Sequence, residues 1–369
     1  MDEKTVFLPA FGNRPSQLVG RDLVIKSFVE GLSQPVGHPD RATLLLGQRG
    51  MGKTALLLEF GDQAEQLGFV VARVTATDNM LEDLIGIIQR TGSSLVAKLP
   101  KVKGVSAGAF GFSVGLTFSD EVEKSFSFLN KLSLLVDELD KRDKGVVILI
   151  DEIQAKTEAM RTLTASYQHL VGEGKNVVIA MAGLPHAISD LLNDEVLTFF
   201  NRARKINLDP LSLNDVRIYY AKVFDELGIG ISQADLEEAV EATRGYPYLL
   251  QLIGYYLLKY SQGPGPAPNR ITHEHLEMAK TSSKWDMREN IYEPVLKPLS
   301  PKDLQFLQAM SMDKGPSRVG EIKERMHASA ATVQIYRKRL IAAGVIAADR
   351  RGEVAFTLPY FGDYLRGEL

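Results

Sequence analysis

The sequence contains no cysteine, one tryptophan and six histidines among its 369 residues. Without cysteine the chain can form neither a disulfide nor a thiolate metal site, and it offers no thiol nucleophile. The histidines are scattered, and none has the spacing of a zinc-binding H-E-x-x-H motif. The sequence therefore excludes disulfide-stabilised proteins, zinc fingers and cysteine-dependent enzymes.

Long apolar runs are also missing, and no stretch approaches the roughly 20 residues that a membrane-spanning helix requires. The first residues, MDEKTVFLPAFGNRP, lack the basic-then-apolar order of a signal peptide. The composition, with 45% hydrophobic and 24% charged residues, is typical of a globular protein. We therefore expect a cytoplasmic protein of two or three domains, with no membrane partner.

An excess of positive charge is missing too, because the formal net charge is -3. This balance argues against a general nucleic-acid-binding protein. The charges are unevenly distributed, however, and residues 296–369 contain twelve Lys and Arg against eight Asp and Glu. The C-terminal segment is therefore where a polyanion could bind.

What the sequence does contain is a glycine-rich stretch, LLLGQRGMGKTALLLEF, at residues 44–60. It has the spacing G-x-x-x-x-G-K-T, between an apolar run typical of a strand and a pattern typical of a helix. In such a loop the backbone N–H groups contact phosphates, Lys53 reaches the β- and γ-phosphates, and Thr54 ligates Mg²⁺. We predict that the loop binds a nucleoside triphosphate through Gly47, Gln48, Arg49, Gly50, Met51, Gly52, Lys53 and Thr54.

A second motif, GVVILIDEIQ, supplies the acidic residues that such a site needs. Its β-branched run at 146–150 predicts a strand that ends at Asp151 and Glu152. Asp151 is expected to hold the Mg²⁺ shell, and Glu152 to polarise the attacking water. An acidic pair can also simply follow a core strand, but the phosphate-binding motif upstream favours the catalytic interpretation.

Strands and helices alternate through the first part of the chain. Strand-like runs are expected at 42–46, 69–74, 146–150, 177–181 and 205–208, with helical periodicity between them. This alternation predicts an α/β fold, a three-layer P-loop NTPase core with a parallel sheet, over residues 1–210. Helical patterns at 213–227, 233–243 and 247–260, followed by a Pro- and Gly-rich and therefore loosely ordered linker at 261–270, predict a helical lid and linker over 211–295.

Beyond residue 299 the pattern changes to that of a winged helix-turn-helix, which we assign to residues 296–369. Three helical patterns precede two strands joined by a basic turn, and in the third helix Val333, Leu340 and Ile341 face the core by their spacing. The side chains left to contact bases and phosphates are Ser329, Gln334, Arg337, Lys338, Arg350 and Arg351. Winged helices also serve as protein-contact modules, so DNA and a protein partner both stay open.

The segments around these motifs resemble AAA+ and STAND P-loop ATPases, in particular initiator-like and archaeal-type ATPases of origin recognition with a C-terminal winged helix. The resembling segments are QLVGRDLVIKSFVEGL at 17–32, IDEIQ at 150–154, FFNRARKINLDPLSLNDV at 199–216 and TRGYPYLLQLIGYYL at 243–257. The resemblance covers nearly the whole chain at the level of the superfamily. It implies ATP as the ligand, and Mg²⁺ with it.

The resemblance also implies roles for residues outside the two motifs. Val19, Gly20 and Arg21 would border the adenine, Arg202 would be an arginine finger, and Arg244, Gly245 and Pro247 would form a sensor in the lid. Three alternatives stay open: Arg21 only begins a helix, Arg204 replaces Arg202, or Arg244 does not reach the γ-phosphate.

In one place the sequence departs from the resembled family. The strand VVIAMAGLP, which begins at Val177, ends without the Asn, Ser or Thr that orients water in initiator ATPases. We therefore expect hydrolysis that is slow or stimulated by a partner.

An insertion ahead of Asp151 contains AFGFSVGLTF at 109–118, in which apolar residues alternate with small ones. This period predicts one strand over 110–118, with 102–107 as its partner and a turn near Gly108. We expect the hairpin to cover the edge of the sheet, and the alternative is a contact with a partner or within a filament.

Two functions are compatible with these patterns. The first is an ATP-binding and ATP-hydrolysing AAA+ protein whose nucleotide state controls assembly or association with double-stranded DNA. The second is a STAND-like signalling switch whose winged helix contacts a protein partner. The expected ligands are ATP or ADP with Mg²⁺, and the candidate partners are a second copy of the chain, if hydrolysis is completed in trans, or another protein. A third interpretation is a nucleotide sensor that does not hydrolyse ATP.

Overall fold

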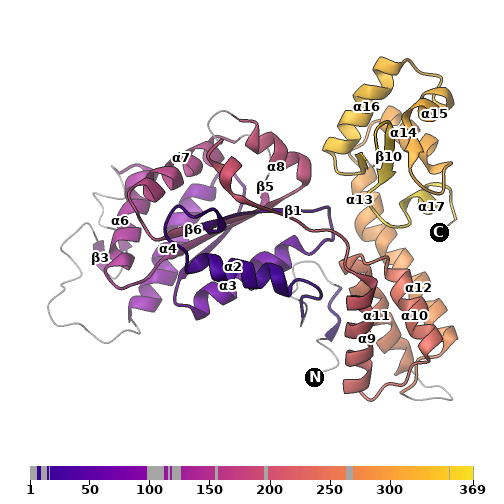
Figure 1. Cartoon of the computed structure of the whole chain (residues 1–369), viewed down its shortest axis with the longest axis horizontal. Coiled ribbons are helices and arrows are strands. Elements are labelled where there is room, and N and C mark those ends of the chain that lie inside the picture. The colour runs from indigo at the N-terminus through magenta and orange to yellow at the C-terminus, as the bar shows by residue number, and fades with distance from the viewer. Residues whose placement is uncertain are drawn as a thin grey trace. The chain divides into compact units, whose positions relative to one another are not determined.

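The computed structural model describes residues 6–9, 15, 17–97, 112–114, 117–118, 126–153, 157–194, 198–262, 269–348 and 350–368. By their internal contacts the residues form two compact units, whose elements are labelled in Figure 1. We call Arg21–Gly47 with Lys53–Leu208 the sheet unit. The helical unit comprises Met1–Gly20, Gln48–Gly52 and Asp209–Leu369. The division into domains 1–210, 211–295 and 296–369 stays a prediction.

The sheet unit contains five parallel strands in the order β2-β5-β6-β1-β7. They are β1 (Ala42–Leu46), β2 (Val70–Thr75), β5 (Val146–Ile153), β6 (Val177–Gly183) and β7 (Arg204–Asn207). The central strand β6 is buried along its whole length. Continuous burial of this kind is typical of a parallel sheet that is covered on both faces.

Helices cover both faces of this sheet (Figure 1). One face carries α4 (Met80–Ala97), α6 (Phe128–Asp140), α7 (Glu158–Gly172) and α8 (Pro185–Leu192), and the other carries α2 (Asp22–Leu32) and α3 (Lys53–Gln66). Two short 3-10 helices, Pro39–Arg41 and Thr198–Arg202, precede β1 and β7. The sheet unit is therefore the three-layer α/β core that the sequence predicted.

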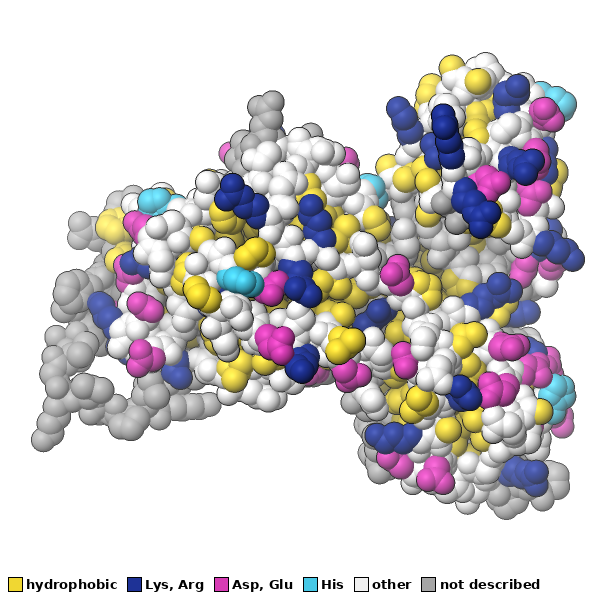
Figure 2. Space-filling view, viewed as in Figure 1, with side chains coloured by type: hydrophobic (Ala, Val, Ile, Leu, Met, Phe, Trp, Pro, Cys, Tyr) yellow, Lys and Arg dark blue, Asp and Glu magenta, His cyan; other side chains and the backbone are white. Residues whose placement is uncertain are grey.

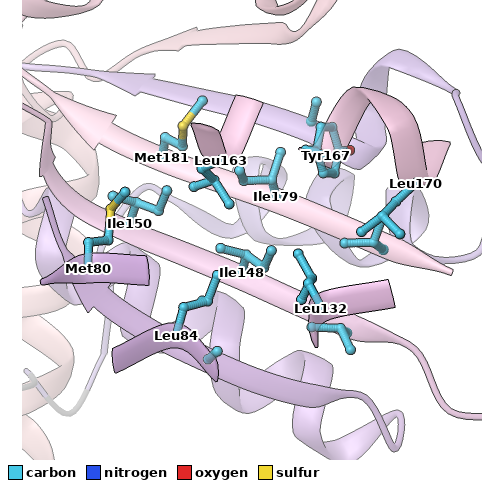
Figure 3. Packing of buried hydrophobic residues seen from close by; sticks show 14 of the residues in the cluster. Met80, Leu84, Leu132, Ile148, Ile150, Leu163, Tyr167, Leu170, Ile179 and Met181 are labelled. Atoms are coloured by element: carbon cyan, nitrogen blue, oxygen red, sulfur yellow. The ribbon is translucent and has the colours of Figure 1, made fainter. Parts of the chain in front are cut away.

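Alternate strand residues supply the two cores of this unit. Figure 3 shows Leu84, Leu132 and Leu163 around Ile148 and Ile179, and all five side chains are fully buried. On the opposite face, the rings of Phe28 and Phe60 stack with their centroids 4.0 Å apart. Full burial of a side chain of this size stabilises the fold by about 1.5–3 kcal/mol.

Hydroxyl side chains mark where several helices begin. The N-cap side chain accepts a hydrogen bond from a backbone N–H of the first turn at Ser127, Thr157, Ser212, Ser232, Thr272, Ser300 and Ser329. Such a cap contributes about 1 kcal/mol, because it satisfies a donor that has no partner within the helix. The boundaries of these helices are therefore set by local sequence.

The helical unit begins with α9 (Leu213–Glu226), α10 (Gln233–Thr243), α11 (Pro247–Ser261) and α12 (His273–Met287). A π-helical turn, Arg288–Tyr292, connects α12 to α13 (Glu293–Leu296). Val6 and Phe7, near the N-terminus, join the core of these helices. Within the described residues, no helix is both long and apolar enough to cross a membrane. Most of the predicted linker, residues 263–268, lies outside the described part of the chain.

Residues 301–365 of the C-terminal segment combine helices with a small sheet. Its elements are α14 (Pro301–Ser311), β8 (Ser317–Arg318), α15 (Val319–Arg325), α16 (Ala330–Ala342), β9 (Ile346–Ala348), β10 (Glu353–Phe356) and α17 (Phe361–Leu365). The strands are antiparallel, in the order β8-β10-β9. The three helices α14, α15 and α16 and the two strands β9 and β10 follow the predicted pattern, whereas β8 and α17 were not predicted. The winged helix itself stays a prediction.

The predicted single strand over 110–118 is wrong. Instead, β3 (Phe112–Val114) and β4 (Thr117–Phe118) pair with each other as antiparallel strands, with Phe112 opposite Phe118. The run contains Gly115 near its middle, and glycine is a residue type that often interrupts strands. The predicted partner segment, 102–107, and the turn near Gly108 lie outside the described residues.

Candidate nucleotide-binding site

The sheet brings the glycine-rich loop and the acidic pair to the same edge. Gly47 follows the last residue of β1, while Asp151 and Glu152 lie near the end of β5. Strand β6 pairs with both strands, so that the two motifs are one strand apart. The N–H of Gly47 donates a hydrogen bond of 3.3 Å to the carbonyl of Gly183, the last residue of β6. Both motifs therefore lie at the carboxyl ends of the parallel strands, which is the edge at which open α/β sheets bind ligands.

Two hydrogen bonds arrange the side chains at the start of α3. The ammonium of Lys53 donates to the carbonyl of Gly47 at 2.8 Å. The hydroxyl of Thr54 donates to Oδ2 of Asp151 at 2.6 Å, across 97 positions of sequence. Hydroxyl and carboxylate oxygens are the protein ligands that Mg²⁺ prefers. Thr54 and Asp151 thus place two suitable ligand atoms together.

Glu152 has an unusual backbone conformation. Its φ is +53°, in the left-handed region that side chains rarely adopt. The pairing of β5 with β6 shifts register between Ile150 and Ile153, and the N–H of Glu152 donates to Oδ1 of Asp151 at 2.9 Å. The side chain of Glu152 is exposed. Backbone strain of this kind costs about 1–3 kcal/mol and is most often found at functional sites. The conformation of Glu152 therefore favours a functional role for this residue.

The tip of the loop, Gln48–Gly52, belongs to the helical unit by its contacts. Gly50 and Gly52 have φ of +73° and +81°, so the sequence needs glycine at both positions. The hydroxyl of Tyr246 donates to the carbonyl of Arg49 at 2.6 Å. The sequence motifs predict no contact of Tyr246 with the loop, although Tyr246 lies between Gly245 and Pro247 of the predicted lid sensor.

Gly245 and Pro247 form a tight corner between α10 and α11. Gly245 has φ of +68°, and a Cβ there would lie 2.2 Å from the carbonyl oxygen of Leu211. The N–H of Leu211 in turn donates to the carbonyl of Gly245 at 2.7 Å. Pro247 is the first residue of α11, a position that suits its fixed φ.

Arg244, which caps α10, is engaged by the C-terminal segment. Its guanidinium lies 4.5 Å from the centroid of the Tyr360 ring, in a cation–π contact. The hydroxyl of Tyr360 donates to the carbonyl of Ala242 at 2.9 Å. In this structure Arg244 therefore contacts an aromatic ring, which favours the alternative in which it does not reach a phosphate.

The predicted adenine-side residues lie in a turn ahead of α2. Val19 is buried in the core of the helical unit. Gly20 has φ of +65°, and a Cβ there would lie 3.1 Å from the carboxylate of Asp215. The backbone carbonyl of Arg21 accepts hydrogen bonds from the first turn of α2, as expected for a residue that begins a helix. Contact of these three residues with adenine stays a prediction.

The two candidate finger arginines differ in their surroundings. Arg204 forms an ion pair of 3.0 Å with Asp40. Arg202 is exposed, and none of the described residues pairs with it. Because Arg204 lies opposite Thr43 in the parallel sheet, Arg202 lies at the amino-terminal edge. The four residue steps from Thr43 to Gly47 span roughly 13 Å of strand, so Arg202 and the start of the glycine-rich loop lie at opposite edges of the sheet.

In the C-terminal segment, five of the predicted contact residues are exposed: Ser329, Gln334, Lys338, Arg350 and Arg351. The hydroxyl of Ser329 also accepts a hydrogen bond of 3.1 Å from the N–H of Thr332, as the N-cap of α16. One expectation needs correction. Arg337 is half-buried and its Nε is fully buried, because α16 turns this side chain partly toward the domain.

The core-facing side of α16 follows the prediction in part. Val333 and Leu340 are buried as predicted, whereas Ile341 is only half-buried. Arg339 forms an ion pair of 2.9 Å with Asp303, whose side chain is 1% exposed, and so connects α16 to α14. Figure 2 shows Lys and Arg side chains over α15 and α16 with acidic side chains among them. The face of the C-terminal segment seen in Figure 2 is therefore mixed in charge.

Comparison with known families identifies two parts of the chain. Residues 17–180 match the family described as AAA ATPase domain. Residues 289–365 match a family described as a domain of unknown function (DUF8462). No curated protein sequence matches the chain.

Solved structures with a similar fold cover nearly the whole chain. The walker-type ATPase PABY2304 of Pyrococcus abyssi has a TM-score of 0.65 and 19% identity, over 96% of this chain and 97% of that one. The ORC2 protein of Aeropyrum pernix, in ADPNP-ADP complexes, has a TM-score of 0.65 and 15% identity, over 97% and 94%. Cdc6p from Pyrobaculum aerophilum has a TM-score of 0.52 and 16% identity, over 100% and 98%. At these identities the likeness is one of fold.

Proposed function

We propose that this protein binds ATP with Mg²⁺ and hydrolyses it slowly or on stimulation by a partner, because residues 17–180 match the family described as AAA ATPase domain. We further propose that its nucleotide state controls assembly or association with double-stranded DNA. The observation that carries the nucleotide site is the hydrogen bond from Thr54 to Asp151, which joins the two sequence motifs. A triphosphate with its metal ion is the ligand that needs both motifs together.

Each residue of the motifs has a distinct role in the proposed site. Lys53 places a positive charge beside the loop, where it pairs with the β- and γ-phosphates. Thr54 and Asp151 would hold Mg²⁺, which neutralises phosphate charge when bound. Glu152 orients the attacking water and accepts its proton.

The position of Arg202 supports hydrolysis completed by a neighbouring subunit. An arginine finger supplied in trans contributes roughly 10³ to 10⁵ in rate in well-studied NTPases. We expect Arg202→Ala to bind ATP normally and to hydrolyse it poorly, with wild-type activity per subunit rising with protein concentration.

A mixture of two variants tests this arrangement directly. Combining Arg202→Ala with Lys53→Ala should restore activity, because one subunit contributes an intact loop and the other an intact finger. Arg204→Ala serves as the matched control, since Arg204 is paired with Asp40. A rate that does not depend on protein concentration, with no rescue in the mixture, would exclude the trans mechanism.

Association with DNA is proposed for the C-terminal segment. Its order of elements is that of a winged helix-turn-helix, with α16 as the recognition helix and the β9–β10 connection as the wing. Gln334 and Lys338 are exposed on α16, and Arg350 and Arg351 are exposed at the wing. These groups can contact base edges and phosphates, respectively.

Charge reversal at the wing tests this proposal. Arg350→Glu combined with Arg351→Glu should weaken duplex binding for all DNA sequences, because a wing mainly contacts backbone phosphates. The slope of log K against log salt should flatten by roughly two, about one for each lost phosphate contact.

The matched control also reverses two positive charges, but at positions of the C-terminal segment outside the wing. Lys302→Glu with Lys314→Glu alters two exposed lysines outside the wing and α16, and should leave the slope unchanged. Equal effects of the two pairs would indicate general electrostatic attraction, and no effect of the wing pair would favour a protein partner.

A STAND-like signalling switch is the second candidate. The contact of Arg244 with Tyr360 and the bond from Tyr360 to Ala242 favour it, because they attach the C-terminal segment to α10. In this function the segment binds a protein partner, and the chain retains no duplex DNA at any salt concentration.

A further inference from the structure

The tip of the phosphate-binding loop is held by a buried tyrosine. The side chain of Tyr246 is 2% exposed. Its hydroxyl donates to the carbonyl of Arg49 at 2.6 Å, and both residues belong to the helical unit. Burial raises the pKa of Tyr246 above its usual range, so that the hydroxyl stays protonated and remains a donor.

The tyrosine ring also packs against the next residue of the loop. A Cβ placed on Gly50 would lie 2.1 Å from the Tyr246 hydroxyl oxygen and 2.5 Å from Cζ, well inside contact distance. Glycine is therefore required at position 50 for two reasons: its φ of +73° and the close approach of the ring. The fit between ring and loop backbone leaves no room for a side chain.

The chain around Tyr246 is itself fixed. Its N–H donates to the carbonyl of Thr243 at 2.8 Å, and the N–H of Gly245 donates to the Thr243 hydroxyl at 3.1 Å. Pro247 follows as the first residue of α11. The corner 243–247 can therefore act as a rigid support for the tyrosine ring.

The peptide geometry turns this contact into an orienting effect. In a planar trans peptide the C=O of Arg49 and the N–H of Gly50 point in opposite directions. When Tyr246 binds the carbonyl, the N–H of Gly50 is directed away from the tyrosine. Loops of this type bind phosphate through such N–H groups, which must all face the anion at once.

We propose that Tyr246 is a positioning residue for phosphate binding, which sets the Arg49–Gly50 peptide so that the Gly50 N–H faces the phosphate groups of the ligand. This role rests on the proposed nucleotide site. Tyr246 acts on the phosphate part of the ligand through the loop and contacts neither the base nor the sugar. A pre-oriented loop binds more tightly, because less ordering is needed on binding.

Removal of the hydroxyl alone tests the proposal. Tyr246→Phe should weaken the binding of Mg·ATP by roughly five- to tenfold, the equivalent of one hydrogen bond of about 1 kcal/mol. Inorganic tripolyphosphate, which lacks the nucleoside, should lose affinity by the same factor. Binding is measured by calorimetry on the full chain, with thermal unfolding recorded for every variant.

The matched control is Tyr220→Phe. Tyr220 is also a buried tyrosine whose hydroxyl donates to a backbone carbonyl, that of Leu250 at 2.8 Å, but it lies in the hydrophobic core of the helical unit, which includes none of the loop residues. The Tyr220→Phe variant should lower the unfolding temperature without changing the affinity for Mg·ATP or for tripolyphosphate. Equal ATP affinities for Tyr246→Phe and wild type would overturn the proposal, as would a loss for ATP with none for tripolyphosphate.

A second variant approaches the contact from the loop. Gly50→Ala places a methyl group against the Tyr246 hydroxyl and should weaken ATP binding by itself. Addition of Tyr246→Phe should then cause little further loss, because the displaced hydrogen bond is already gone. Fully additive losses would contradict the proposal. Lys53→Ala distinguishes failure of the proposed nucleotide site from failure of the proposed role of Tyr246. If the loop is not a nucleotide site, Lys53→Ala leaves ATP binding unchanged.

Discussion

Lys53→Ala is expected to weaken ATP binding by at least about a hundredfold, because it removes the charge that pairs with two phosphates, and charge-assisted hydrogen bonds contribute about 1.5–3 kcal/mol each. The Lys53 ammonium lies 2.8 Å from the Gly47 carbonyl, at the base of the loop. The loss of stability is expected to be smaller, since the hydrogen bond to the Gly47 carbonyl is a part-buried one that contributes about 1 kcal/mol.

Calorimetric titration of the variant with Mg·ATP measures the effect. Lys26→Ala is the control, since Lys26 is an exposed residue of α2 in the same unit and should bind ATP like the wild type. Unchanged affinity in Lys53→Ala would refute the assignment of the loop as a phosphate-binding site.

Glu152→Gln should separate binding from turnover. The amide keeps the size of the side chain and leaves Asp151 intact, but it cannot accept a proton from water. Turnover should therefore fall by roughly two to four orders of magnitude, while ATP affinity stays within about threefold. Phosphate release and calorimetry on the same preparation measure the two quantities.

Glu158→Gln, at the start of α7, provides the control for loss of one carboxylate from the sheet unit. A Glu152→Gln variant with wild-type turnover would show that another group activates the water. A wild-type rate near background would instead support the non-hydrolysing sensor, in agreement with the missing polar side chain at the end of β6.

Local patterns were sufficient to predict most of the fold. Parallel strands buried on both faces produce continuous apolar runs, which is why the strands ending at Ile153 and Gly183 were found. Helix α12 was missed because its sequence, HEHLEMAKTSSKWDM, is mainly polar and its buried face includes Ser283. The strand predicted over 110–118 failed because alternation alone does not show whether a run is one strand or two.

In the candidate site, too, some features are visible in local sequence motifs and others depend on how distant parts of the chain pack. Lys53, Thr54 and Asp151 follow from motifs whose spacing is visible along the chain, and their roles still await the experiments above. The contact of Tyr246 with the loop joins positions 197 apart, and the ion pair of Arg339 with Asp303 depends on how two helices pack. The left-handed backbone of Glu152 was equally hidden, since glutamate carries no preference for that conformation.

The most direct test of the central claim is the titration of labelled duplex DNA with the full chain in Mg·ATP, in Mg·ADP and without nucleotide, at several salt concentrations. We expect the affinities in ATP and ADP to differ by at least about fivefold, the lower end of typical coupling between two sites. All specific binding should weaken steeply as salt rises. Identical affinities in the three nucleotide states, or no retained DNA at low salt, would contradict nucleotide-controlled association with DNA.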